Sequence, residues 1–461
     1  MGNWPLFFIK LNMKQLIEVN IPAQTFKVEI DIEGTPPPID PPTDPPAPPV
    51  QTDFIIGSNG FPWFPLHLIK SVGINWMRCY FATGWGYEPD GLSMQPLNQA
   101  WTNETNGMDD LLLRAKTMGM NILWANHQTP EHFRNTGRSD GNNDYAPIPA
   151  GAKRNEAASF KWYAEYMWQL IARYGSVKYP DSDLIVDSSP RWTGDENYKK
   201  SGLNLLKYIQ PWNEEKWWLK GTEAYIEPET MAALMSATYD GHEGTLGEKT
   251  GIKTADKSVV VVAPPISDYD IPYIDLMDKW FKANRKDKKW PCDVYSIHHY
   301  SNIGNKPKQH PAQWKVSGGC YPSEDQNFDT IKEIIAYFAA RGLKVWVTEF
   351  GYDTLAPSNM HIVGKGGESD EQAQGRAIVE SIKKYKEYGA AGVFFFTGPD
   401  DIGNGQFTKS GIFTKQADGH KPKAAVPIIK AYIESAGLKK MAKKPPFEFS
   451  ISNFKRPMKI K

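Results

Sequence analysis

The sequence predicts an α/β fold, a (β/α)8 TIM barrel, for most of its 461 residues. Eight short hydrophobic runs, rich in β-branched and aromatic residues, recur between residues 53 and 437, and helical patterns lie between them. Strands that alternate with helices form parallel sheets, and eight of them can close into a barrel. The region is longer than the ~250 residues typical of this fold, but insertions account for such an excess.

The strands and helices can be placed along this region in order. The expected strands are 53–57, 75–81, 121–127, 207–212, 258–263, 294–300, 345–349 and 392–396. The expected helices are 108–118, 157–174, 229–239, 273–284, 327–341, 371–388 and 424–436. The longest excess, 128–206, lies between the third and fourth strands, on the side of a barrel where loops build binding sites.

Three further segments flank the predicted barrel. Residues 1–34 end in a β-like stretch that is too short for a core of its own, so an anchoring or assembly role fits it. Residues 35–52 form a Pro-rich linker, with nine prolines between 35 and 49, and such a run is a semi-rigid spacer. The C-terminal tail, 438–461, carries eight Lys and Arg against one acid; we expect it to be solvated, with contact to an anionic glycan or surface as the alternative.

The composition of the chain disfavours several classes of function. Lys plus Arg and Asp plus Glu balance at 53 each, so nothing points to nucleic acid or to a charged membrane surface. Aromatic residues make up 13% of the chain, and they can fill a core or stack on sugars. The three cysteines have no metal-binding spacing, and no stretch is long enough to span a membrane or to form a signal-peptide core. We therefore expect no metal and no other cofactor.

Unusual polar residues fall where the predicted strands end, which is where a barrel places its active residues. These residues are Arg78, His127, Asn213, Glu214, His298, Tyr300 and Glu349. Two carboxylates on separate strands are what double-displacement glycoside hydrolysis needs. Either glutamate alone could instead be a structural ion-pair partner, and His127 could be a core histidine. Strand alternation turns His299 to the other side, toward the helices, where it would be structural.

The order Arg, Asn-Glu, His-x-Tyr and Glu on the second, fourth, sixth and seventh strands resembles the clan A glycoside hydrolases. The resemblance covers roughly residues 53–436. In the stretches PWNEEKWW, SIHHY and VTEFGYDT it is nearest to family 39-like and related endo-acting bacterial enzymes that degrade polysaccharides.

This resemblance implies a retaining mechanism and a role for each matching residue. Glu214 would be the general acid/base, with a raised pKa, and Glu349 the nucleophile, held by Arg78 and Tyr300. Asn213 would bind the 2-hydroxyl of the sugar in the −1 subsite, and the two carboxyl groups would be about 5–5.5 Å apart.

Further substrate contacts are implied as well. His298 and His127 would line the −1 subsite. Trp212, Trp217 and Trp218 are candidates for stacking on neighbouring sugars, and we assign Trp218 to substrate binding, with one of the last two tryptophans in the core.

Two departures from the clan pattern stand out. Glu215 occupies the place of a proline after the acid/base, so either glutamate could be the acid; alternation puts the two on opposite sides, and the Asn-Glu pairing favours Glu214. The last strand has three phenylalanines, ending at Phe396, where the clan usually has a tryptophan.

The sequence therefore predicts a retaining glycosidase that acts on a polysaccharide or oligosaccharide, most simply an endo-acting enzyme for a β-linked polysaccharide, outside the cell or on its surface. An exo-acting β-glycosidase is one alternative. Another is a non-catalytic carbohydrate-binding or adhesion protein attached through residues 1–34. A barrel enzyme for non-sugar substrates is disfavoured by Asn213 beside Glu214.

Overall fold

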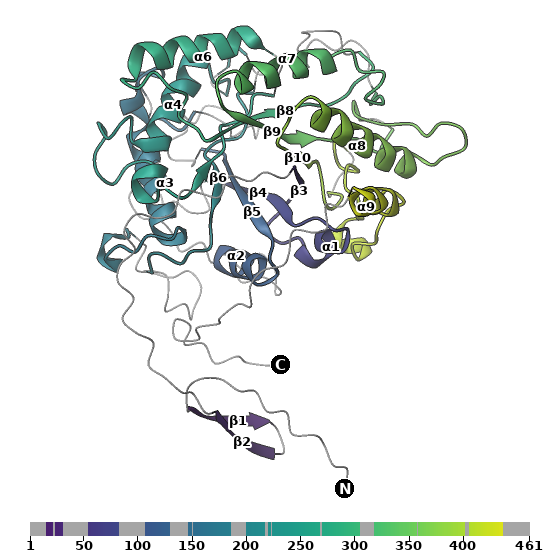
Figure 1. Ribbon diagram of the computed structural model, residues 1–461, viewed down its shortest axis with the longest axis horizontal. Helices are drawn as coiled ribbons and strands as arrows, with labels where there is room; N and C mark the ends of the chain where they lie inside the picture. Colours follow the sequence, from purple (N-terminus) through teal and green to yellow (C-terminus); the bar gives the residue numbers. More distant parts are fainter. Residues whose placement is uncertain are drawn as a thin grey trace. The chain divides into compact units, whose positions relative to one another are not determined.

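The computed structural model describes the following residues: 15–21, 24–30, 54–82, 107–129, 146–149, 151–185, 200–216, 220–222, 224–267, 270–304, 318–356, 358–401 and 405–436. The chain divides into two units, the first ending at Ala47. In the first unit, β1 (Gln15–Ile21) and β2 (Gln24–Ile30) pair antiparallel, as the β-like pattern there predicts. Figure 1 shows the two units without fixing their relative position.

The second unit is the predicted barrel, which confirms the fold class (Figure 1). Its strands are β3 (Ile55–Gly60), β4 (Trp76–Ala82), β5 (Asn121–His127), β6 (Tyr208–Gln210), β7 (Val260–Val261), β8 (Val294–His298), β9 (Lys344–Phe350) and β10 (Gly392–Phe395). They are parallel and follow the order β7-β6-β5-β4-β3-β10-β9-β8. Parallel bridges from Val262 to Val294 and from Ile266 to Ile297 bring the two ends of this sheet together.

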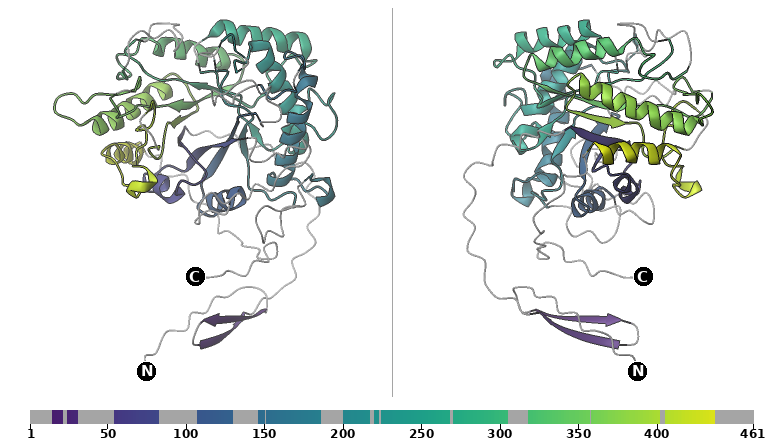
Figure 2. Two further views of the ribbon diagram at one scale, coloured as in Figure 1. Left: turned by 180° about the vertical axis from the view of Figure 1, so that it is seen from behind. Right: turned by 45° about the vertical axis from the view of Figure 1, so that its right-hand side comes forward.

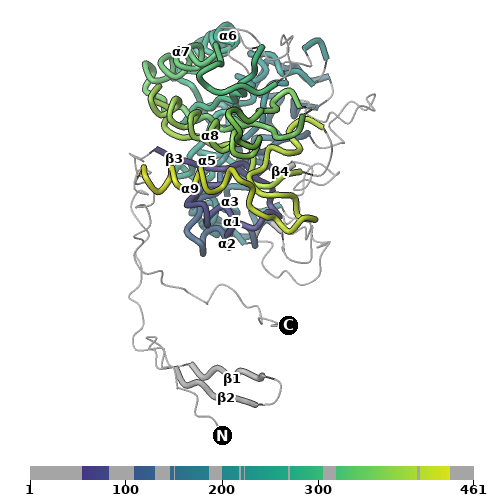
Figure 3. The backbone as a smooth tube through the Cα atoms, turned by 90° about the vertical axis from the view of Figure 1, so that its right-hand side faces the viewer, coloured from purple at the N-terminus to yellow at the C-terminus, as the bar shows by residue number. Residues whose placement is uncertain are grey.

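Helices surround the strands, as Figure 1 shows from the front and Figures 2 and 3 show from behind and from the side. They are α1 (Leu66–Ser71), α2 (Gly107–Thr117), α3 (Lys161–Tyr174), α4 (Pro228–Asp240), α5 (Ile252–Ala255), α6 (Ile271–Asn284), α7 (Phe328–Ala339), α8 (Asp370–Glu387) and α9 (Ala425–Ser435). The seven expected helices are all present. The two that the pattern missed, α1 and α5, have only six and four residues, too few for helical spacing to stand out.

The apolar bottom of the barrel is filled by large rings. Trp76, Trp346 and Phe394 meet edge-on or tilted, with ring centroids 5.7–6.2 Å apart, and all three are buried. Gly57 makes room for them, because a Cβ at this position would collide with the ring of Phe394. The barrel interior is therefore a packed core below the site.

A polar layer lies above these rings. Gln210 on β6 donates to Ser296 Oγ on β8, at 2.8 Å, and to the carbonyl of Ala263, at 3.0 Å. Its own side-chain oxygen accepts from Arg78 Nε on β4, at 2.8 Å. This layer connects the packed bottom of the barrel to the charged groups at the strand ends.

The cysteines follow the sequence pattern, and Cys79 lies within β4. Cys79, Cys292 and Cys320 are buried free thiols. Among the described residues, no helix has the length and apolar character needed to cross a membrane.

Candidate active site

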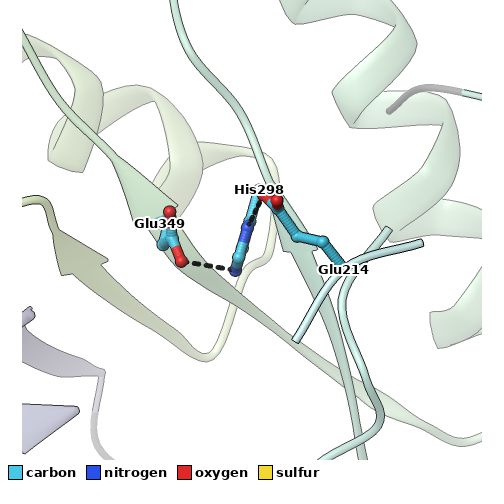
Figure 4. Close-up of side chains that lie close together, drawn as sticks. All are labelled: Glu214, His298 and Glu349. Atoms are coloured by element: carbon cyan, nitrogen blue, oxygen red, sulfur yellow. Dashed lines mark hydrogen bonds and ion pairs between the residues drawn. The ribbon is translucent and has the colours of Figure 1, made fainter. Parts of the chain in front are cut away.

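The two predicted carboxylates face each other across one imidazole (Figure 4). Glu349 comes from β9, His298 from the end of β8, and Glu214 from the loop that follows β6. His298 Nδ1 donates to Glu214 Oε1 at 2.6 Å, and its Nε2 lies 3.3 Å from Glu349 Oε1. Single side-chain atoms of the three residues all lie within 4.8 Å of one another. The fold therefore brings together residues that are 135 positions apart in the sequence.

Three donors hold the Glu349 carboxylate. Arg78 Nη1 donates to Oε1 at 2.7 Å, Tyr80 donates to the same oxygen, and Tyr300 donates to Oε2 at 2.6 Å. Burial and the neighbouring Glu349 raise the pKa of Tyr300 well above its usual value, so this hydroxyl keeps its proton and remains a donor. Both carboxylate oxygens of Glu349 are therefore held in place by hydrogen-bond donors.

Arg78 connects the two halves of the site. Its guanidinium is fully buried on β4 and also donates to Asn59 Oδ1 at 2.9 Å and to Asn213 Oδ1 at 2.6 Å. Because Arg78 bonds both Glu349 and the residue before Glu214, one cation sets the spacing between the two carboxylates. A planar fork of five N–H groups makes this possible, and a lysine could not replace it.

Glu214 lies in a sharp turn and beside a second cation. Its φ is +54°, in the left-handed region, and Lys216 Nζ lies 3.4 Å from its Oε2. Burial favours the neutral acid, but Lys216 and the hydrogen bond from His298 outweigh it and hold the pKa of Glu214 well below its usual range. Our expectation of a raised pKa is therefore wrong for the ligand-free protein, because a lysine that the motif does not include pairs with the carboxylate.

Glu215 points away from this cluster, as strand alternation predicts. It is buried and accepts from Ser267, whose backbone N–H lies 2.8 Å from Oε2 and whose hydroxyl lies 2.7 Å from Oε1. Burial and the nearby Glu214 raise the pKa of Glu215 to about 7. This carboxyl ties the turn after β6 to the segment that follows β7 and does not face Glu349.

The burial of Glu215 should make the free energy of unfolding depend on pH. We expect the free energy of unfolding to fall between about pH 4.5 and pH 7, because folding raises the Glu215 pKa from 4.5 to about 7. The stabilisation is complete below the unfolded pKa and is lost as the pH rises through the folded one, a change on the order of 3 kcal/mol. Urea unfolding at a series of pH values should show a flatter profile for Glu215→Gln. Glu387→Gln, an exposed change on α8, should leave the profile unchanged; an unaltered slope in Glu215→Gln would refute this account.

The structure places the other predicted contacts as follows. His127 ends β5, and its ring meets the ring of Tyr80 edge-on, with centroids 5.7 Å apart, so it borders the site. Trp212 is wholly buried and packs against Tyr163 of α3, at 5.8 Å, which leaves it no face for a sugar; the stacking expectation is wrong for this residue. Trp217 and Trp218 lie outside the described residues. His299 bonds Tyr385 and Asp325 on the helix side, as alternation predicts.

Three residues of the site are not among those predicted from the sequence. Tyr80 shares its side of β4 with Arg78, so the period of two could have indicated it. Asn59 stands at the end of β3, where a polar residue in an apolar strand is such a signal. Lys216 has no such signal, because its place depends on left-handed backbone at positions 214 and 216.

Phe396 fills the place at the end of β10 where the clan usually has a tryptophan. It is partly exposed, and its ring lies 6.4 Å from Tyr80 and 6.5 Å from Tyr300, the two tyrosines that hold Glu349. An aromatic wall therefore stands beside the nucleophile candidate even though its residue type departs from the pattern.

Glu214, His298 and Glu349 form the one group in the described part of the chain whose side chains lie close enough to hold a metal ion. The guanidinium of Arg78 already bonds Glu349, and Lys216 already lies beside Glu214. Two cations within the cluster oppose the binding of a third. The geometry is therefore that of a charge-balanced acid pair more than that of a metal centre.

No protein-family model matches the sequence, and no curated protein matches it. Among solved structures, the chain is similar to a family 39 glycoside hydrolase from the gut symbiont Bacteroides cellulosilyticus WH2, with a TM-score of 0.51 and 13% identity over 92% of this chain and 70% of that chain. It is also similar to a beta-glucosidase from Thermotoga maritima (TM-score 0.49, 11% identity, 84% of this chain and 98% of that one). A third similar structure is the endo-beta-1,4-mannanase from Thermotoga petrophila (TM-score 0.47, 14% identity, 86% and 79%). The likeness to the family 39 enzyme shows that the chain has the barrel fold of the glycoside hydrolases that its motifs resemble.

Proposed function

We propose that this protein is a retaining glycoside hydrolase that cleaves a β-linked polysaccharide. The observation that carries the proposal is the pair Glu214 and Glu349, which come from separate strand ends and have carboxylate oxygens within 4.8 Å of each other. Retaining enzymes hold their two carboxyl groups about 5–5.5 Å apart, whereas inverting enzymes need about 6.5–9.5 Å to admit a water. A nearest approach of this size between single oxygens fits the retaining arrangement, and the three donors that orient Glu349 support direct attack by this carboxylate.

The contacts support a different role for each carboxylate. Glu349, oriented by Arg78, Tyr80 and Tyr300, attacks the anomeric carbon, and its new C–O bond replaces the glycosidic bond. Glu214 gives a proton to the departing oxygen and then takes one from the water that releases the sugar. Asn213 Oδ1 is engaged by Arg78, so its amide nitrogen is the group that can donate to a sugar hydroxyl.

Endo action on a polymer is supported by two further aromatic residues. Phe61 and Trp63, just after β3, stack with centroids 4.8 Å apart and planes at 4°, and both are partly exposed. Phe61 lies 6.3 Å from the ring of Tyr80, whose hydroxyl bonds Glu349. Flat rings one step from the reacting centre suit a second sugar of a chain.

Phe61→Ala is therefore expected to raise KM for a polysaccharide roughly three- to tenfold, the effect of losing one aromatic contact, with little change for a short aryl glycoside. Steady-state kinetics on both substrates measure the difference. Leu276→Ala, an exposed apolar change on α6, is the matched control. Equal losses on the short and the long substrate would remove the argument for an extended binding site.

The proposed activity can be tested with purified protein and a panel of plant, algal and microbial polysaccharides. Reducing ends should appear with the wild type, and NMR of the first products should show that the anomeric configuration is retained. A polymeric substrate would also favour a location outside the cell. Retention of a glycan on an affinity gel without any release of reducing ends would instead support the carbohydrate-binding or adhesion protein, and release of single sugars alone would support an exo-acting β-glycosidase.

A further inference from the structure

Lys216 lies beside Glu214, where its positive charge disfavours the protonated carboxyl that a general acid needs. The backbone at Lys216 is left-handed, with φ of +55°, and this turn brings the side chain back over Glu214, two residues earlier. Nζ lies 3.4 Å from Glu214 Oε2, and 14% of the Lys216 side chain is exposed. A non-glycine residue in this backbone region costs roughly 1 kcal/mol or more, so the surrounding structure holds the cation in place against a local preference.

The other charged groups around Glu214 are fixed. Arg78 is fully buried and bonds Glu349, Asn213, Asn59 and Gln210, and His298 is buried between the two carboxylates. The Tyr80 and Tyr300 hydroxyls bond Glu349. Glu215 bonds Ser267 on the other side of the turn. Lys216 is the partly exposed cation of this set, and so the one that an incoming molecule can draw away from Glu214.

A neutral sugar carries no charge that competes with Glu214 for the ammonium group of Lys216. An anionic group does compete, since an ammonium group exchanges one carboxylate for another at little cost in a partly exposed site. Once the ammonium has turned to the substrate, Glu214 loses its attraction and also acquires a negative charge nearby. Both changes favour the protonated acid, which is the form that can protonate a leaving oxygen.

We propose that Lys216 binds an anionic group of the substrate, a carboxylate or a sulfate ester on a sugar next to the bond that is cleaved, and that the polysaccharide is therefore acidic. This inference rests on the glycosidase function proposed above and names its substrate class. The substrate itself then supplies the condition under which Glu214 takes up a proton from solvent. The lowered pKa of Glu214 in the ligand-free protein is a resting state that such a substrate relieves.

Paired substrates test the inference. The wild type is to be assayed on a β-linked uronic-acid polysaccharide and its carboxyl-reduced form, and on a sulfated polysaccharide and its desulfated form. We expect kcat/KM to be at least tenfold higher for the anionic member of one pair, which also tells a carboxylate from a sulfate. Added salt should reduce this preference, because screening weakens a partly exposed ion pair.

The variant Lys216→Met separates the substrate role from a structural one. It should lose the preference for the anionic member, so that kcat/KM for the two members of the pair becomes nearly equal, and its pH–rate profile should extend to higher pH because Glu214 holds its proton longer. Lys383→Met, an exposed change on α8, should keep the wild-type preference.

Two failures can be told apart. Cleavage of neutral and anionic members at equal rates, abolished by Glu349→Ala, would overturn the role of Lys216 and leave the glycosidase proposal standing. Absence of hydrolysis of every member of both pairs would count against both proposals.

Discussion

Replacing Glu349 by alanine is expected to lower kcat on the polysaccharide on the order of 10⁵-fold, the scale of loss when an enzyme is deprived of its nucleophile. The variant lacks the oxygen that would bond the anomeric carbon, and the donors Arg78, Tyr80 and Tyr300 are left without their acceptor. Reducing-end assays at saturating substrate measure this loss. Glu387→Ala, an exposed change on α8, should retain wild-type rates.

Stability has to be separated from chemistry in this experiment. Removing one partner of a buried ion pair typically costs about 3–5 kcal/mol, and Arg78 is wholly buried. Glu349→Gln keeps the side-chain shape and one carbonyl oxygen, so it should unfold closer to the wild type while remaining as inactive as the alanine variant. More than a few per cent of wild-type activity in a folded Glu349→Gln protein would rule out Glu349 as the nucleophile.

Glu214→Gln is expected to have the second-largest effect, a fall in kcat of roughly 10²–10⁴-fold on the polysaccharide, the usual contribution of a general acid/base. An aryl glycoside whose leaving group departs without a proton should still form the covalent intermediate. Release of that intermediate by water then lacks its base, so intact-mass measurement should detect a glycosylated enzyme. Azide, an anion that attacks without a base, should restore turnover.

The neighbouring glutamate provides the comparison for this result. Glu215 bonds Ser267 and faces away from Glu349, so Glu215→Gln should neither accumulate the intermediate nor respond to azide. If Glu215→Gln behaved in these ways and Glu214→Gln did not, the acid/base role would move by one residue.

The fold could be predicted from the sequence because the strands are short hydrophobic runs separated by helices of regular spacing. Each of the eight expected strands coincides with an observed one, although β6 and β7 have only three and two residues where six were expected. The hydrophobic runs extend beyond the residues that pair in the sheet, so run length overestimates strand length. Glu214 and His299 face the sides that alternation predicts, although both lie beyond the last residue of their strands and Glu214 has left-handed backbone.

The electrostatics of the site could not be predicted in the same way. The motif around Glu214 indicates which residue is the acid candidate, but the lowered pKa of Glu214 depends on Lys216, and the place of Lys216 depends on two left-handed turns. Trp212 shows a similar limit, because its neighbours in sequence suggest an aromatic surface, whereas Tyr163 of α3, 49 residues earlier, covers it. Contacts between distant segments decide both outcomes.

The rings of Trp76, Trp346 and Phe394 close the lower end of the barrel, and Gly57 lets them fit. The barrel is therefore closed at this end, so a substrate reaches Glu349, and a product leaves it, only at the C-terminal ends of the strands. A polymer cannot be threaded through it and has to lie across the opening, with both of its ends outside. If the proposed endo action is right, each cleavage would leave two fragments at this one opening, and the next substrate molecule would compete with those products for entry.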